Sequence, residues 1–366
     1  MGNYSFTLSS DPLNTKEKDL FKGHLESLEL NDTIWNLFES LFQTTSRNTV
    51  PLMLRMSSGD ELVAAVVMIK CFNYGITLTR LKPLINLIQL FRFPVHVWMR
   101  AGIAPELMAN PGFVNDKYDS AEIYPILMEH IQRKLFLSFV HDLKDNSHLY
   151  PSGIKLNYPD EGVIDMEYVV SEENYRRLHK NIKKKIRHFR SKGGMVEIIT
   201  GRLSDEDVQM VGQSIESTSK HSIFKLPYQE IYPAMCMASA TIEDENVVHF
   251  ICRTETLFLG YHSFLDFGTH LRCLNGAFNR ELKTTHHAYE NMIMKVVAYA
   301  DERKIKRIYF GPVLNETKSR MMHEFLSTRI HFSSSNPILK AVFPPILKNS
   351  RMANKSVMRF SSRNGG

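Results

Sequence analysis

Two stretches of the chain share one pattern of apolar and polar positions, that of a β-hairpin. In the first, apolar runs at 52–56 and 62–72 flank Ser-Ser-Gly-Asp; in the second, runs at 247–252 and 257–267 flank Arg-Thr-Glu. A short polar break between two apolar runs favours a hairpin. The pattern therefore predicts two pairs of neighbouring antiparallel strands.

The elements that follow each hairpin also occur in the same order. They are a strand at 95–99, a helix from Ser120 and a strand at 137–140, then a strand at 271–277, a helix from Thr284 or Thr285 and a strand at 307–310. Apolar residues at helical spacing form the helix stripes, which are Ile123, Ile126, Leu127, Ile131 and Leu135, and Tyr289, Ile293, Val296, Val297 and Ala300. The repeated order of hairpin, strand, helix and strand predicts a duplicated α/β unit.

A basic helix joins the two units. Residues 153–170 are predicted to be extended, with a turn at Pro159–Gly162, and a helix then begins near Ser171 and ends at Gly193 or Gly194. Its stripe is Tyr175, Leu178, Ile182, Ile186 and Phe189, and its other faces carry Arg176, Arg177, Lys180, Lys183, Lys184, Lys185, Arg187, Arg190 and Lys192. A strand at 195–200 and a helix at 204–218 lead into the second hairpin.

The length of 366 residues predicts two domains. We place them at 1–150 and 151–345, with the basic helix 172–192 in the second, and we interpret 346–366 as a basic mobile tail. The tail carries Lys348, Arg351, Lys355, Arg359 and Arg363 and no acid, nearly the whole net charge of +6. The charge therefore points to the helix and the tail rather than to the core.

Several protein classes lack a signal in the sequence. The four cysteines form no C-x-x-C pair, which excludes a zinc ribbon and favours reduced thiols in a cytoplasmic protein. The apolar stretch 81–99 is interrupted by charged residues and prolines, so no membrane insertion is expected. No metal motif, Walker loop or hydrolase elbow occurs, so no metal site is predicted.

Two longer motifs are SEENYRRLHKNIKKKIRHFRSKGGMVEI (171–198) and AYENMIMKVVAYADERKIKRIYFGPVLNETKSRMMHEF (288–325). They resemble motifs of a known family, the tandem-GNAT acyltransferases that include the Fem peptidoglycan-bridge transferases and related N-acyltransferases. Gly311 and Lys318 match the closing motif of this family, whereas Met321 and Met322 stand where a glycine is usual. The resemblance covers about residues 50–345.

The resemblance implies two tandem GNAT-like domains, each a mixed, mostly antiparallel sheet flanked by helices. It also implies an N-acyltransferase that moves an acyl group from acyl-CoA, a co-substrate rather than a permanently bound cofactor, to an amine in a ternary complex. The acceptor would be an amino acid, an amino sugar or a small amine. Proximity supplies much of the rate, a base takes the amine proton, and an acid protonates the leaving thiolate.

The phosphate loop of ordinary GNAT enzymes is not readable. At its place, between a predicted strand and a predicted helix start, stand Arg280, Lys283, Thr284 and Thr285. Free N–H groups at a helix start bind anions, so these four residues are the candidates for acyl-CoA phosphates. An ordinary capped helix with solvated basic neighbours is the alternative.

Candidate catalytic residues come from the second hairpin and the strand at 307–310. His262 and Asp266 alternate with Phe264 on one face of an apolar strand, where burial is costly without a partner or a purpose. Either could serve as base or acceptor-binding group, and Tyr309 as proton donor. Structural roles in a polar core network are the alternative for all three residues.

The basic helix leaves the acyl donor open. Lys183 and Arg187, together with Lys318, are candidate substrate-binding residues, and a solvated helix face is the alternative. Clustered Lys and Arg also suit tRNA, the donor of a Fem-like aminoacyltransferase, although no aromatic residues interleave with the charges. A third alternative is a non-catalytic GNAT-fold binding protein.

Overall fold

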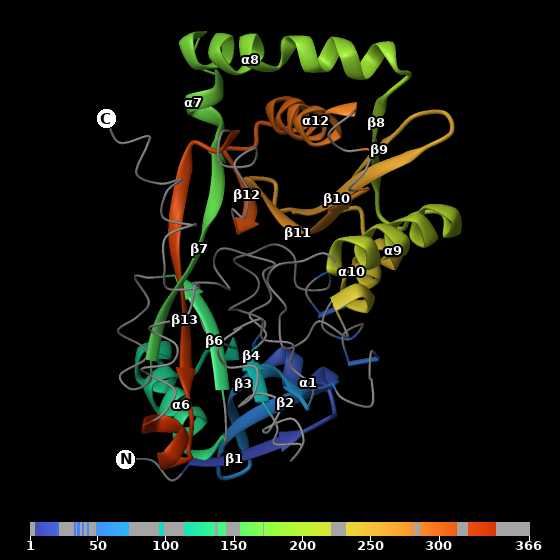
Figure 1. Ribbon diagram of the computed structural model, residues 1–366. Coiled ribbons are helices and arrows are strands. Elements are labelled where there is room, and N and C mark those ends of the chain that lie inside the picture. Colours follow the sequence, from blue (N-terminus) through green and yellow to red (C-terminus); the bar gives the residue numbers. More distant parts are fainter. Residues whose placement is uncertain are drawn as a thin grey trace. The chain divides into compact units, whose positions relative to one another are not determined.

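The computed structural model describes residues 4–21, 49–72, 95–98, 113–135, 138–143, 154–170, 172–220, 232–279, 286–312 and 321–341, and several single residues in 33–43 and at 282. The chain divides into two compact units. Unit 1 comprises Met1–Pro159, Ile223–Tyr232 and Ser327–Gly366, and unit 2 comprises Asp160–Ser222 and Pro233–Leu326. Figure 1 traces the elements along the chain.

Unit 1 contains the first predicted hairpin, with β2 (Thr49–Ser58) paired to β3 (Glu61–Cys71). Strand β1 (Tyr4–Ser9), which the sequence did not predict, extends this hairpin at the other edge of β2. The strand order is β1-β2-β3-β4-β6-β13. Strands β4 (Val95–Trp98) and β6 (Ser138–Leu143) are parallel to each other. The short strand β5 (Phe113–Val114) pairs with β3 outside this order. The helices of unit 1 include α1 (Thr15–Asp19) and α6 (Ser120–Lys134), and Asp119 is the N-cap of α6.

The last strand of the chain returns to unit 1. Strand β13 (Glu324–Ser333) pairs antiparallel with β6, from Thr328 opposite Leu143 to Ser333 opposite Ser138. Residues 327–345, which we assigned to the second domain, thus fall in unit 1 by this division. The sequence did not predict this strand, because pairing across a whole domain leaves no local signal. The predicted tail, 346–366, lies outside the described residues.

Unit 2 has a sheet in the order β7-β12-β11-β10-β9-β8. Its strands are β7 (Ile154–Asp165), β8 (Met195–Thr200), β9 (Val247–Arg253), β10 (Phe258–Asp266), β11 (His270–Phe278) and β12 (Arg307–Pro312). All neighbours are antiparallel except β11 and β12. The second hairpin is therefore confirmed, but the turn predicted at Pro159–Gly162 is wrong, because β7 continues through it.

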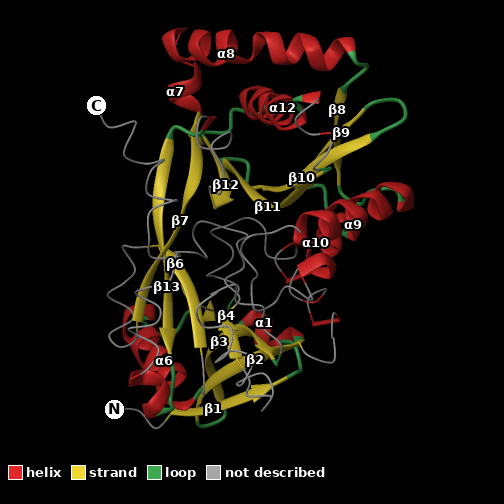
Figure 2. Cartoon of the chain, in the orientation of Figure 1, coloured by secondary structure: helices red, strands yellow, loops and turns green. Residues whose placement is uncertain are grey.

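Helices lie against both faces of this sheet (Figure 2). The helices of unit 2 are α7 (Met166–Val170), α8 (Glu172–Ser191), α9 (Asp205–Lys220), α10 (Tyr232–Thr241) and α12 (Ala288–Glu302). Helix α12 packs on the face formed by β9, β10 and β11, and α8 packs on α12. Helix α9 contacts β10 and β11 from the other face.

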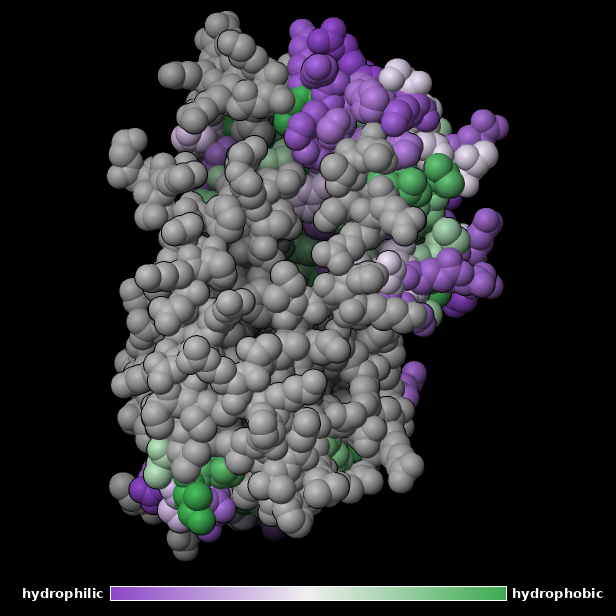
Figure 3. Space-filling model, viewed as in Figure 1, coloured by the Kyte–Doolittle hydropathy of each residue, from purple (hydrophilic) through white to green (hydrophobic). Residues whose placement is uncertain are grey.

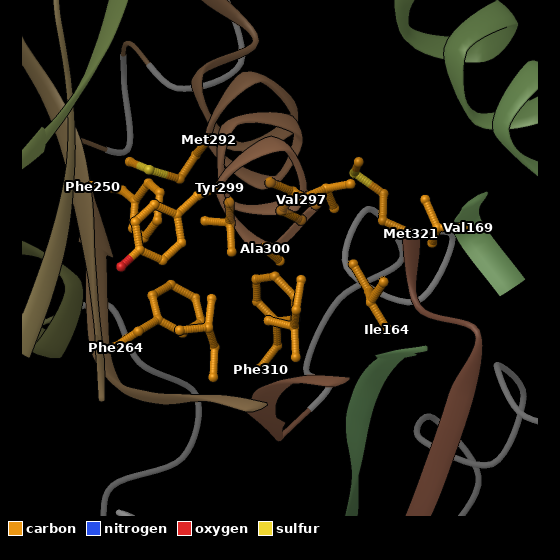
Figure 4. Close-up of a cluster of buried hydrophobic side chains, with 14 of the residues drawn as sticks. Ile164, Val169, Phe250, Phe264, Met292, Val297, Tyr299, Ala300, Phe310 and Met321 are labelled. Atoms are coloured by element: carbon orange, nitrogen blue, oxygen red, sulfur yellow. The ribbon is translucent and has the colours of Figure 1, made fainter. Parts of the chain in front are cut away.

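The core of unit 2 lies between α12 and the sheet (Figure 4). Phe264 is fully buried, with ring centroids 5.6 Å from Phe250 and 5.5 Å from Phe310. Burial of a large aromatic side chain stabilises a fold by about 1.5–3 kcal/mol. A second core in unit 1 joins the apolar stripe of α6 to β2 and β3. Each unit therefore buries its own core, which confirms the α/β class with two mixed, mostly antiparallel sheets.

Candidate active site

Strands β11 and β12 of unit 2 form a fork. They pair in parallel at only three positions, His270 with Arg307, Leu271 with Ile308 and Arg272 with Tyr309. Strand β11 continues to Phe278, while β12 continues to Pro312 along β7. Beyond Arg272, that edge of β11 has no strand partner in the described part of the chain. Unpaired backbone groups at diverging parallel strands are suited to binding a ligand.

A buried ion pair stands where the fork begins. Nη1 of Arg272 lies 2.7 Å from Oε1 of Glu161, and the side chains are 4 % and 2 % exposed. The guanidinium carbon of Arg272 lies 5.3 Å from the ring centre of Tyr309, so the three residues form one cluster. Alternation places Tyr309 on the face opposite Ile308 and Phe310, which belong to the core under α12.

The predicted catalytic residues do not come together. Tyr309 lies in the cluster with Arg272, and its hydroxyl is hydrogen-bonded to Arg307, which raises the pKa of that guanidinium. His262 lies on the opposite face, its ring 5.4 Å from Phe278, 5.8 Å from Tyr289 and 6.2 Å from Phe310. Gly276 of β11 makes room for it, since a Cβ there would lie 2.1 Å from Cδ2 of His262.

Asp266 is saturated by donors from its own unit. Its Oδ1 accepts a hydrogen bond from the Gly268 amide at 2.8 Å, and its Oδ2 accepts one from the Tyr299 hydroxyl at 2.8 Å. Nε of Arg303 lies 3.0 Å from the same Oδ2. Burial and this bond raise the pKa of Tyr299. The carboxylate thus closes the turn between β10 and β11, where Gly268 has a φ of +74°.

Basic side chains gather at the start of α12. The helix begins at Ala288, later than predicted, and its N-cap His287 makes no side-chain cap bond. The His188 ring of α8 lies 5.5 Å from that of His287, and Lys185 pairs with Glu290 in the first turn of α12. Burial lowers the pKa of His287, Lys185, His188 and Lys192 lower it further, and Glu290 opposes them.

The predicted binding residues fall in two groups. Lys183 and Arg187 are exposed on α8, whereas Lys185 and His188 of the same helix reach α12. The candidate phosphate ligands Arg280, Lys283, Thr284 and Thr285, and the candidate Lys318, lie outside the described residues. Met321 and Met322 are buried in the core of unit 2.

Glu161 and Arg272 were missed by sequence reasoning. Glu161 lies in a turn predicted from the sequence. Arg272 lies in a strand predicted from the sequence, and its charge was not considered a sign of function. The signal that could have found Arg272 is an isolated charged residue inside a run that is otherwise apolar, because burial of such a charge requires a partner. Nothing local marks Glu161, which is buried only because β12 pairs with β7.

Other buried polar residues occupy the same face of the sheet as Arg272. Nδ1 of His249 lies 2.7 Å from Oγ of Ser263, and burial lowers the pKa of His249 to about 4. Nδ2 of Asn275 donates to Oγ of Ser239 in α10 at 2.8 Å. No group of three or more His, Cys, Asp or Glu side chains among the described residues could hold a metal ion.

The sequence of the segment that contains these elements identifies its domain type. Residues 176–319 match the acetyltransferase (GNAT) domain family. The GNAT segment includes β10, β11, α12 and β12, and with them the fork. The GNAT resemblance deduced from the motifs is thereby confirmed over these residues. No curated protein matches the sequence.

Two solved structures superpose on this chain with a TM-score above 0.5 at low sequence identity. L-PGS from Bacillus licheniformis superposes with a TM-score of 0.51 and 8 % identity, over 93 % of this chain and 98 % of that one. The C-terminal domain of a putative lysylphosphatidylglycerol synthetase from Agrobacterium fabrum gives 0.52 and 7 %, over 90 % and 97 %. A tandem GNAT protein from the clavulanic acid biosynthesis pathway gives 0.49 and 8 %, over 91 % and 99 %. No helix in the described part of this chain could cross a bilayer.

Proposed function

We propose that the protein is an N-acyltransferase that moves an acyl group from acyl-CoA directly to an amine in a ternary complex. The observation that carries this proposal is the GNAT family match over residues 176–319, the segment that contains both the fork and the start of α12. The acceptor would be an amino acid, an amino sugar or a small amine. The active site would lie within unit 2.

The start of α12 is suited to the phosphates of the acyl donor. Helix N–H groups and the positive end of the helix dipole favour an anion there. Lys185 of α8 adds positive charge there, although its partner Glu290 offsets part of it, and the His188 ring lies beside that of His287. Arg280, Lys283, Thr284 and Thr285 precede this helix in the sequence and remain the predicted phosphate ligands.

The fork would hold the thioester. Backbone N–H groups on the edge of β11 beyond Arg272, which has no strand partner in the described part of the chain, can donate to the oxyanion that develops on the thioester carbonyl. Tyr309, at the last pair of the β11–β12 ladder, is the proposed proton donor to the leaving thiolate. Because both oxygens of Asp266 already accept bonds, we propose that Asp266 and His262 position β10 and β11 rather than contact the reactants.

The test measures CoA affinity and product together. Calorimetry should show saturable CoA binding, and mass spectrometry should show an acylated amine after incubation with acetyl-CoA and an amine panel. Lys185→Gln should weaken CoA binding about tenfold, a loss of about 1.4 kcal/mol. The control is Lys295→Gln, which removes the same charge from an exposed site further along α12 and should leave the affinity unchanged. Absence of both CoA binding and product would contradict the proposal and favour a non-catalytic GNAT-fold protein.

A second candidate is transfer from aminoacyl-tRNA, favoured by the exposed face of α8 (Figure 3). Its described cations Lys183, Arg187 and Arg190 share one stripe and are all exposed, with Lys184 beside them. If this stripe neutralises RNA phosphates, it releases their counterions, so the affinity for RNA falls steeply as the salt concentration rises. If this candidate is right, replacing these four residues by Gln should abolish salt-sensitive tRNA binding while CoA binds poorly even to the unaltered protein. Tight CoA binding without tRNA affinity would exclude it.

A further inference from the structure

The carboxylate of Glu161, beside the fork, accepts no hydrogen bond from the described part of the chain. Glu161 is 2 % exposed, and Nη1 of Arg272 lies 2.7 Å from its Oε1. That approach lacks the angle of a hydrogen bond, so neither oxygen of Glu161 accepts one from the described residues. A buried carboxylate normally accepts several bonds, and leaving it without them is costly.

Glu161 lies beside the two strands that form the fork. Glu161 lies opposite Pro312 on β12, and the register between β12 and β7 shifts between Tyr309 and Pro312. The same short segment of β12 therefore adjoins Glu161 on one side and the last β11 pair, Arg272 with Tyr309, on the other. By contrast, both oxygens of Asp266 already accept hydrogen bonds, from Gly268 and Tyr299.

We infer that Glu161 is the acceptor-binding residue and general base of this site, and that its ligand is a primary amine that arrives as an ammonium ion. This inference rests on the proposed acyl transfer. Arg272 supplies the counter-charge of the carboxylate, and the ammonium group donates to a Glu161 oxygen that accepts no hydrogen bond from the described residues. The carboxylate then takes one proton from the ammonium group.

The freed amine nitrogen attacks the thioester carbonyl carbon of acyl-CoA. A C–N bond forms, the C–S bond breaks, and the thiolate leaves with the electron pair. The thiolate then takes the Tyr309 hydroxyl proton, and the second amine proton passes to solvent as the amide forms. Glu161 returns its proton to solvent and Tyr309 is reprotonated, so the site is restored. Because Glu161 is buried in the free protein, a small amine is the appropriate probe.

The first experiment compares the full-length protein with Glu161→Gln, using acetyl-CoA and n-butylamine. Release of free thiol should fall at least 100-fold in kcat/KM for the amine, while calorimetric acetyl-CoA affinity stays within twofold. Without any acyl donor, n-butylamine should raise the melting temperature of the unaltered protein but not of the variant, and n-butanol should raise neither. Retention of amine transfer within threefold in the variant, or an equal shift from n-butanol, would overturn the inference.

A second variant separates a catalytic role from a structural one. If Glu161→Gln unfolds, Glu161→Leu combined with Arg272→Met replaces the whole pair by apolar side chains, an exchange that folded proteins often tolerate. The double variant should fold, bind acetyl-CoA and transfer nothing; full transfer would show a purely structural pair and overturn the inference. Failure of acetyl-CoA to bind the unaltered protein would contradict the proposed function instead, and the amine-dependent melting shift would still decide the role of Glu161.

Discussion

The two faces of the unit 2 sheet differ in what they bury. The face under α12 holds a continuous apolar core that includes Phe250, Phe264 and Ile308. The opposite face holds buried polar side chains on neighbouring strands, among them His249, Arg272 and Glu161. Apolar packing gains free energy from burial alone, whereas each buried polar group needs a partner to offset its desolvation. The first face therefore supplies stability, and the second has the features of a site that acts on a ligand.

The largest expected effect on stability comes from removing a large side chain of the apolar face. Phe264→Ala removes a fully buried ring from contact with Phe250 and Phe310, and should lower the free energy of unfolding by about 3–5 kcal/mol. Chemical denaturation followed by circular dichroism measures this loss. Leu257→Ala is the control, because this side chain is 41 % exposed and should cost less than about 0.5 kcal/mol. Equal effects at the two positions would contradict the assignment of the core.

A second change tests whether the polar face contributes stability. Arg272→Met leaves the Glu161 carboxylate buried without its counter-charge, and should cost about 3 kcal/mol of unfolding free energy. Adding Glu161→Leu should recover most of that loss, because an apolar pair needs no compensation. Denaturant titrations of the single and double variants give both values. A double variant that is no more stable than the single one would mean that the pair itself holds the strands together.

The buried imidazole of His249 on the polar face should make the free energy of unfolding depend on pH. The folded-state pKa of His249 is about 4, below its ordinary 6.5, so the unfolded chain binds a proton that the folded protein excludes. Stability is therefore retained above pH 6.5 and falls as the pH is lowered towards 4, by up to about 3 kcal/mol. Unfolding titrations across this range should show the loss, and His249→Phe should remove it. Ser263→Ala, which keeps the imidazole, should keep the pH slope; a slope that persists in His249→Phe would contradict this account.

The smallest expected effect concerns His262, the polar exception on the apolar face. A methyl group at Gly276 would overlap its ring, so Gly276→Ala should cost about 1–3 kcal/mol. The cost should shrink when His262→Ala is added, because the clash then disappears, and a double-mutant cycle measures this coupling. Gly268→Ala is a comparison without a clash, since nothing lies within 4 Å of its Cβ position, and its cost reflects only the positive φ.

The local elements of the fold were predictable because their signals are local. Apolar runs on either side of short polar breaks marked β2, β3, β9 and β10, and helical spacing marked α6 and α12. Pairings that join distant segments were not predictable in the same way. Strand β13 and the full length of β7 escaped prediction, because their residues become strands through the partners that they find in the folded protein.

For the candidate site, the sequence by itself determined the type of domain and the neighbourhood of the chemistry. The two motifs pointed to a GNAT acyltransferase, and the element order placed strands at 271–277 and 307–310, with a helix start between them, in the second half of the chain. Only the tertiary structure decided which side chains meet there. In the folded protein, Asp266 accepts hydrogen bonds from Gly268 and Tyr299, and aromatic rings surround His262. Glu161 forms an ion pair with Arg272. The physical reason is that periodicity tells which face a residue occupies, whereas the burial and pairing of a charge depend on strands that are far apart in sequence.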